Sequence, residues 1–155
     1  MKISYGAVLP LPPEDAFSFV ADPENWPLFL PTVRSASKNR DWGQVGGHAH
    51  LTNKVLGRLF SMDLELTEWD PPRSFRYTVS QGGKPGNDDN RRSFEPVPGG
   101  TRLTGLTEIS TQAGVLGLLG HLQMRLVARV FAKAMARLPE AAARQSQPPG
   151  AAHLP

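Results

Sequence analysis

Apolar and polar residues alternate with a period of two through the middle of the chain. Residues 62–67 (MDLELT) and 75–80 (FRYTVS) each place apolar side chains on every second position. This period is typical of a strand that buries one face and exposes the other. Glycine- and proline-rich turns divide residues 33–110 into short runs, which predicts about six antiparallel strands joined by short loops.

The rest of the chain predicts one further strand and three helices. A strand is expected at residues 2–9, followed by a short helix after Pro13 and a second short helix that begins at Asp22-Pro23. Residues 115–138 carry apolar side chains at helical spacing, which predicts a long amphipathic helix that ends before Pro139. The Ala-, Gln- and Pro-rich residues after it are expected to form a flexible tail.

This order of elements predicts an α+β fold. A one-sided antiparallel sheet must bury its apolar face, and the C-terminal helix is the predicted element with enough apolar area to cover it. We therefore expect a curved sheet wrapped around the long helix, with the two short helices after the first strand. Because a cylinder does not fill a wide trough, an apolar cavity is expected between sheet and helix.

Several segments resemble the START-like (SRPBCC) superfamily, and within it the polyketide cyclase/dehydrase and lipid-transport group. They are PPEDAFSFVADPENWP at 12–27, EWDPPRSF at 68–75, FEPV at 94–97 and GGTRLT at 99–104, together with the long closing helix. The resemblance implies a helix-grip fold over residues 1–143, with residues 144–155 as the tail. It also implies hydrophobic-ligand carriers or aromatase/cyclases as relatives, between which the fold alone does not choose.

Composition removes several classes of function. The chain of 155 residues has no cysteine, which excludes disulfides, thiolate nucleophiles and iron–sulfur clusters. The N-terminus lacks a secretory pattern, and no apolar run is long enough to span a bilayer, so a soluble cytoplasmic protein is expected. The net charge of +3 comes from the C-terminal part: residues 115–155 hold five basic and one acidic side chain.

Two side chains are candidates for catalysis. Tyr77 shares a strand face with apolar neighbours, so its hydroxyl is expected to face the cavity, where it could orient a carbonyl or an enol. His50 titrates near neutral pH and could act as an acid or base. His48 and His50 share one face of a strand, but a third metal ligand would have to come from Asp63 or Glu65, so no metal site is predicted.

The carboxylates Asp63 and Glu65 lie on the polar side of their strand and are expected to face solvent. A row of four cations at spacing four follows the long helix. It is interpreted as a solvated face or as a docking surface for an anionic membrane, while the lack of interleaved aromatic residues argues against nucleic acid. The row consists of Arg125, Arg129, Lys133 and Arg137.

The leading hypothesis is a protein that binds or transports a hydrophobic small molecule, either lipid or polyketide-like. The alternatives are a polyketide cyclase/dehydratase-type enzyme, and a protein that docks on a membrane or macromolecule through the cationic row. No cofactor motif is present, and neither the ligand nor the oligomeric state follows from the sequence. The residues expected to line the cavity are Phe29, Leu64, Leu66, Phe75, Tyr77, Leu119, Leu122, Leu126 and Val130.

Overall fold

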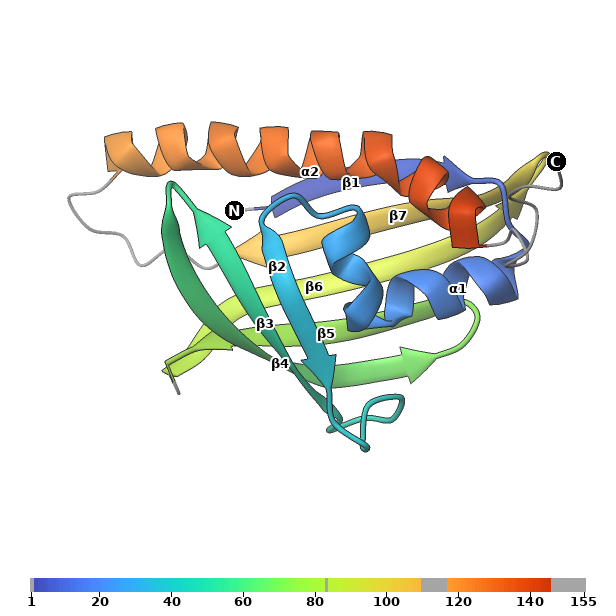
Figure 1. Cartoon of the computed structure of the whole chain (residues 1–155), viewed down its shortest axis with the longest axis horizontal. Helices are drawn as coiled ribbons and strands as arrows, with labels where there is room; N and C mark the ends of the chain where they lie inside the picture. The colour runs from blue at the N-terminus through green and yellow to red at the C-terminus, as the bar shows by residue number, and fades with distance from the viewer. Residues whose placement is uncertain (1, 83, 110–116, 146–155) are drawn as a thin grey trace, which may run out of the picture.

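A computed structural model describes residues 2–82, 84–109 and 117–145. A strand and two short helices come first: β1 (Lys2–Leu9), α1 (Pro13–Ala21) and the 3-10 helix η1 (Pro23–Leu28). Six strands and a long helix follow (Figure 1): β2 (Val33–Lys38), β3 (His48–Val55), β4 (Arg58–Asp70), β5 (Ser74–Gln81), β6 (Lys84–Val97), β7 (Gly100–Ile109) and α2 (Gly117–Gln145).

The strands form one curled antiparallel sheet with the order β1-β7-β6-β5-β4-β3-β2. Neighbours in sequence from β2 to β7 are also neighbours in the sheet, which confirms the predicted meander. The first strand closes the order by pairing with the last, and α2 lies alongside it (Figure 1). The α+β architecture of a curved half-barrel sheet with a long C-terminal helix is confirmed.

The inner face of the sheet, which α1 and η1 cover, is apolar at its centre. Leu64, Leu66 and Phe75 are almost completely buried, while the intervening Glu65 and Arg76 are exposed, as the period of two predicts. Phe17 of α1 packs edge to face on Phe75 at 5.7 Å between ring centroids. Two further aromatic residues contact the Phe17 ring in the same way, namely Trp69 and Phe94.

Local sequence explains how the two short helices begin. Pro13 occupies the first turn of α1, where its missing N–H costs nothing, and two acidic residues follow it. The carboxylate of Asp22 caps η1 by accepting a hydrogen bond from the Glu24 backbone N–H at 3.0 Å. The indole N–H of Trp26 donates to the Val20 carbonyl at 2.8 Å, which fixes η1 against α1.

Helix α2 is longer than predicted, because it continues through Pro139 to Gln145. The prediction that it ends before Pro139 is therefore wrong. The tail predicted at residues 144–155 lies almost wholly outside the described residues and stays a prediction. A proline inside a helix costs about 3 kcal/mol, but Leu138 and Ala142 on either side of it are both fully buried. Their packing offsets the cost. The buried stripe of α2 lies in its C-terminal half and consists of Ala134, Met135, Leu138 and Ala142.

Candidate ligand-binding site

Polar side chains gather on the inner face of the sheet beside its apolar centre. The antiparallel register puts them on four adjacent strands, since Tyr77 of β5 is paired with Asn90 of β6, and Asn90 with Thr107 of β7. Each of these strands alternates with a period of two, so residues two apart share the inner face. We call this group the inner polar cluster: Tyr5, Tyr77, Asn90, Arg92 and Thr107.

Arg92 is the central residue of the inner polar cluster and is only 6% exposed. Its Nη2 donates a hydrogen bond to the Tyr77 hydroxyl at 2.9 Å, and its Nη1 donates to the Arg91 carbonyl at 3.3 Å. The guanidinium carbon also lies 4.8 Å from the ring centroid of Tyr5 and 5.5 Å from that of Tyr77. Two aromatic rings therefore flank the cation, at distances where cation–π attraction operates.

Tyr5 lies between strand and helix. Its ring stacks on Phe131 of α2 with 4.5 Å between centroids, and it crosses the backbone of Gly105 on β7. A Cβ at position 105 would lie 2.1 Å from the Tyr5 ring, so a glycine is needed there. The Tyr5 hydroxyl is buried, yet it has no hydrogen-bond partner within the described part of the chain.

Burial determines the protonation state of the two tyrosines. It raises the pKa of Tyr5 and that of Tyr77, while the positive charge of Arg92 opposes both shifts. The nearby Thr107 hydroxyl also opposes the rise in the pKa of Tyr5, although it donates its own proton to Oδ1 of Asn90 at 2.8 Å. Both tyrosine hydroxyls thus keep their protons at neutral pH and can donate hydrogen bonds.

The residues predicted to line a cavity do not all lie together. Leu64, Leu66, Phe75 and Tyr77 are buried on the inner face of the sheet. Phe29, which was expected near an entrance, is buried and packs on Phe19 at 6.0 Å between ring centroids. On α2, Val130 is half-buried and Leu126 is 41% exposed, while the side chains of Leu119 and Leu122 lie outside the described part of the structure.

His50 does not meet Tyr77, because the two side chains leave the sheet on opposite faces. His50 is exposed, and its Nδ1 lies 2.8 Å from Oδ1 of Asp63 on the next strand. His48 is likewise exposed, with its Nδ1 3.2 Å from Oδ2 of Asp41. Within the described ranges, no three His, Asp or Glu side chains are grouped closely enough to hold a metal ion.

The predicted docking surface on α2 is solvent-exposed. All four of its cations are exposed, and none of them has a carboxylate partner among the ion pairs of the described residues. Its role as a docking surface stays a prediction from the sequence. No helix of the described residues is long and apolar enough to cross a membrane.

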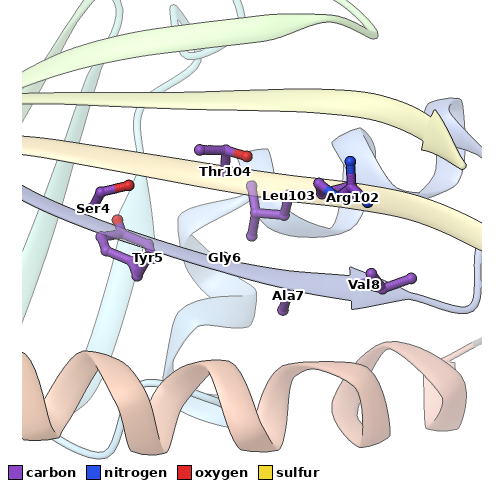
Figure 2. A pocket seen from close by; sticks show the side chains of 8 residues that line it. All are labelled: Ser4, Tyr5, Gly6, Ala7, Val8, Arg102, Leu103 and Thr104. Atoms are coloured by element: carbon purple, nitrogen blue, oxygen red, sulfur yellow. The ribbon is translucent and has the colours of Figure 1, made fainter.

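A hollow of about 460 Å³ lies along the paired strands β1 and β7, and Tyr5 of the inner polar cluster is one of its lining residues (Figure 2). Ser4 to Val8 line it on one side and Arg102 to Thr104 on the other. The even-numbered residues among them are exposed, so the hollow belongs mainly to the outer face of the sheet. Its one charged side chain, Arg102, lies 3.5 Å from Glu95.

Sequence reasoning missed most of the inner polar cluster. Tyr77 was predicted to face the interior, but Tyr5, Asn90, Arg92 and Thr107 were not singled out. Counting in twos from a buried residue on the same strand would have found most of them. Phe94 leads back to Arg92 and Asn90, and Leu103 leads forward to Thr107.

Comparisons with known proteins give the family and the fold. A family model described as "Polyketide cyclase / dehydrase and lipid transport" matches residues 1–143. A search of curated proteins finds no match.

Solved structures give the same fold over nearly the whole chain. The protein TTHA0849 from Thermus thermophilus is 18% identical, with a TM-score of 0.75 over 95% of this chain and 100% of that one. The ZhuI aromatase/cyclase from Streptomyces sp. R1128 is 14% identical, with a TM-score of 0.74 over 97% and 98% of the two chains. Ara h 8.0201 is 16% identical, with a TM-score of 0.61 over 90% and 98%. At these identities the likeness concerns the fold alone.

Proposed function

The chain belongs to the polyketide cyclase/dehydrase and lipid-transport family, and on this premise we propose that it binds a hydrophobic small molecule against the inner face of its sheet. The molecule is lipid or polyketide-like and lies between the sheet and α2, with one end at the inner polar cluster. The fold of this family hosts several activities, so the proposal depends on the residues of the site and not on the fold.

The observation that carries the proposal is the buried hydroxyl of Tyr5, which has no hydrogen-bond partner in the part of the chain that the structure describes. A buried hydroxyl without a hydrogen bond costs about 1 to 3 kcal/mol, so a bound group that accepts its proton would lower the free energy of the complex. The ring of Tyr5 is held by Phe131 and lies across Gly105, which keeps the hydroxyl in a fixed place.

Partly covered apolar side chains on the inner face of the sheet and on α2 suit an apolar ligand. Met62 and Val79 are partly buried and pack against the core from β4 and β5. Val130 and Phe131 are half-buried on α2, and Leu126 one turn earlier is exposed. Apolar side chains that are only partly covered are the groups that gain most when an apolar ligand removes them from water.

Binding can be measured with a neutral fluorescent probe such as N-phenyl-1-naphthylamine, and native mass spectrometry of freshly purified protein can detect a retained ligand. We expect Phe131→Ala to weaken probe binding, because it removes the ring that holds Tyr5. Leu56→Ala is the matched control, since Leu56 is 88% exposed on the turn between β3 and β4. A protein that retains no ligand and binds no probe contradicts the proposal.

A second candidate function is catalysis of the cyclase/dehydratase type, and the hydrogen bond from Arg92 to Tyr77 favours it. A hydroxyl that receives a hydrogen bond from a cation becomes a stronger donor to a developing enolate oxygen. His50 cannot assist this step from the outer face. Turnover of a synthetic poly-β-carbonyl thioester should fall at least about tenfold in Tyr77→Phe; unchanged turnover of every substrate removes Tyr77 from this role.

A further inference from the structure

The positive charge of Arg92 has no counter-ion among the described residues. Its two hydrogen bonds go to neutral oxygens, the Tyr77 hydroxyl and the Arg91 carbonyl. The sequence contains no Asp or Glu between Glu108 and Glu140 or after Glu140, so the undescribed residues add no acidic side chain. No carboxylate side chain that the structure describes beside Arg92 therefore balances its charge.

Asp88 is the acidic residue that shares the inner face of β6 with Arg92. Its charge acts on the Tyr77 hydroxyl, but no ion pair joins it to Arg92 among the described residues. Four residues along a strand correspond to about 13 Å. Burial raises the pKa of Asp88, which is opposite to the effect of a paired guanidinium. The neighbouring Asp89 faces the other way and pairs with Arg76.

A guanidinium remains charged at every pH at which a protein is folded. Arg92 therefore cannot avoid the free-energy cost of a buried charge by losing a proton. The rings of Tyr5 and Tyr77 offset part of it by cation–π attraction. A buried charge that is not neutralised is nevertheless a strongly unfavourable arrangement in a folded protein. An anion that enters the site removes this cost, and the free energy gained appears as affinity.

The unused hydrogen-bonding groups around Arg92 are donors. The guanidinium has five N–H groups, and two of its nitrogens make the hydrogen bonds described above. Tyr77 accepts from Arg92, which leaves its own proton free to donate. Tyr5 donates to no described residue. Three side chains thus offer protons to a common region, and a group with several oxygen lone pairs is the partner that fits them.

We propose that the hydrophobic ligand carries one monoanionic oxygen group, a carboxylate or the enolate of a 1,3-dicarbonyl, which Arg92 binds with the hydroxyls of Tyr77 and Tyr5. This inference rests on the proposed function and names the chemical class of its ligand. A single negative charge matches the single cation. A phosphate monoester carries close to two charges at neutral pH, so it would leave the buried site with a net negative charge.

The test compares ligands that differ only in charge, through displacement of the neutral probe. Decanoate should bind roughly 10- to 100-fold more tightly than methyl decanoate, which is the gain expected for hydrogen bonds to a charged group. An acidic 1,3-diketone and its non-enolisable 2,2-dimethyl analogue form the second arm. Preference for the anion in the first arm identifies a carboxylate ligand, and preference in the second arm identifies an enolate. Decyl phosphate should bind more weakly than decanoate.

Substitution separates the role of Arg92 from that of its neighbours. In Arg92→Met we expect the preference for the anion to disappear while methyl decanoate still binds. The thermal stability of the free protein should change little, because removal of an uncompensated buried charge offsets the loss of the hydrogen bond to Tyr77. Arg91→Met is the control, since Arg91 lies on the outer face with its guanidinium 3.4 Å from Glu68. Its anion preference should equal that of the wild type.

The outcomes distinguish this inference from the proposed function. Equal binding of decanoate and methyl decanoate overturns the anion site and leaves the proposed hydrophobic site intact. Absence of binding by all ligands overturns both. If Arg92→Met does not fold, Arg92→Lys keeps the charge without the planar fork, and the wild-type comparison of matched ligands remains decisive.

Discussion

Arg92 donates a hydrogen bond of 2.9 Å to the hydroxyl of Tyr77, whereas the hydroxyl of Tyr5, whose ring lies beside the same guanidinium, is buried without a partner among the described residues. Two tyrosines that contact one cation therefore differ in the state of their hydroxyl groups. In the free protein the Tyr77 hydroxyl accepts a hydrogen bond, and the Tyr5 hydroxyl has none from the described residues. This difference makes the two positions separable by experiment.

Removal of the two hydroxyls should change stability unequally. Tyr77→Phe removes a hydrogen bond from a charged donor and should lower the free energy of unfolding by about 1.5 to 3 kcal/mol. Tyr5→Phe removes a buried hydroxyl that has no described partner, so it should be neutral or stabilising by up to about 1 kcal/mol. Urea unfolding of both variants measures the difference. An equal loss in the two variants would show that the Tyr5 hydroxyl has a partner in solution.

The two tyrosines should also lose their protons at a higher pH than an exposed tyrosine does. They are the only tyrosines in the chain, and burial raises the pKa of both above the ordinary value near 10. Their contribution to stability is full below the pKa of the unfolded state, and it is lost as the pH rises through the higher values of the folded state. Tyrosinate absorbance of the native protein should appear well above pH 10, and in urea near pH 10.

The measurement of tyrosinate absorbance has an internal control. Tyr77→Phe should halve the amplitude of the tyrosinate signal and leave only the signal of Tyr5. If the native protein titrates at the same pH as the protein unfolded in urea, the two rings are not buried as described.

Gly105→Ala should destabilise the protein because its Cβ would overlap the Tyr5 ring. We expect a loss of about 1 to 3 kcal/mol, the usual cost of an extra methyl in a packed site. In a Tyr5→Ala background the same substitution should cost much less, since the obstacle is gone. A double-mutant cycle gives the coupling energy between the two positions. Additive effects would mean that the ring of Tyr5 does not lie on Gly105.

Consecutive aspartates on β6 should have opposite effects on stability. Burial raises the pKa of Asp88, so its contribution is largest below the ordinary pKa near 3.9 and is lost as the pH rises. The hydrogen bonds from Arg76 lower the pKa of Asp89, so its contribution is present above that value and is lost as the pH falls through the folded-state pKa.

At neutral pH, Asp88→Asn should therefore stabilise the protein, and Asp89→Asn should destabilise it by about 0.5 to 1 kcal/mol, a value kept small by partial exposure. Both differences should shrink when unfolding is measured below the ordinary aspartate pKa. Effects of the same sign in the two variants would contradict the alternation of their side chains across the sheet.

Much of the fold followed from a few local signals. Pro10 directly follows the end of β1, Pro13 starts α1, and Asp22-Pro23 starts η1. The turn between β3 and β4 was missed, because Leu56 adopts a positive φ of 50° in a position where leucine is not a turn signal. The end of α2 was misplaced because the burial of Ala142 outweighs the cost of Pro139. Such tertiary compensation is not visible in a local pattern.

The site was harder to predict than the fold for a related reason. In residues 88–93 (DDNRRS) both faces of β6 are polar, so hydrophobic alternation gives no direction. Phe94, directly after this segment, is the apolar residue that marks the inner face. His50 was the opposite case, since buried Ala49 and Leu51 on either side place it on the outer face. An inward polar residue is found only by counting from an apolar one.

The pairing of β1 with β7 has a consequence for the order of folding. Tyr5 of β1 is paired with Gly105 of β7. About a hundred further residues must therefore be synthesised after β1 before its partner strand exists. The hairpins from β2 to β7 have near neighbours and can form earlier. Until β1 and β7 meet and α2 closes over Tyr5, Arg92 keeps its hydration shell. We expect the inner polar cluster to be the last part of the molecule to reach its final structure during synthesis.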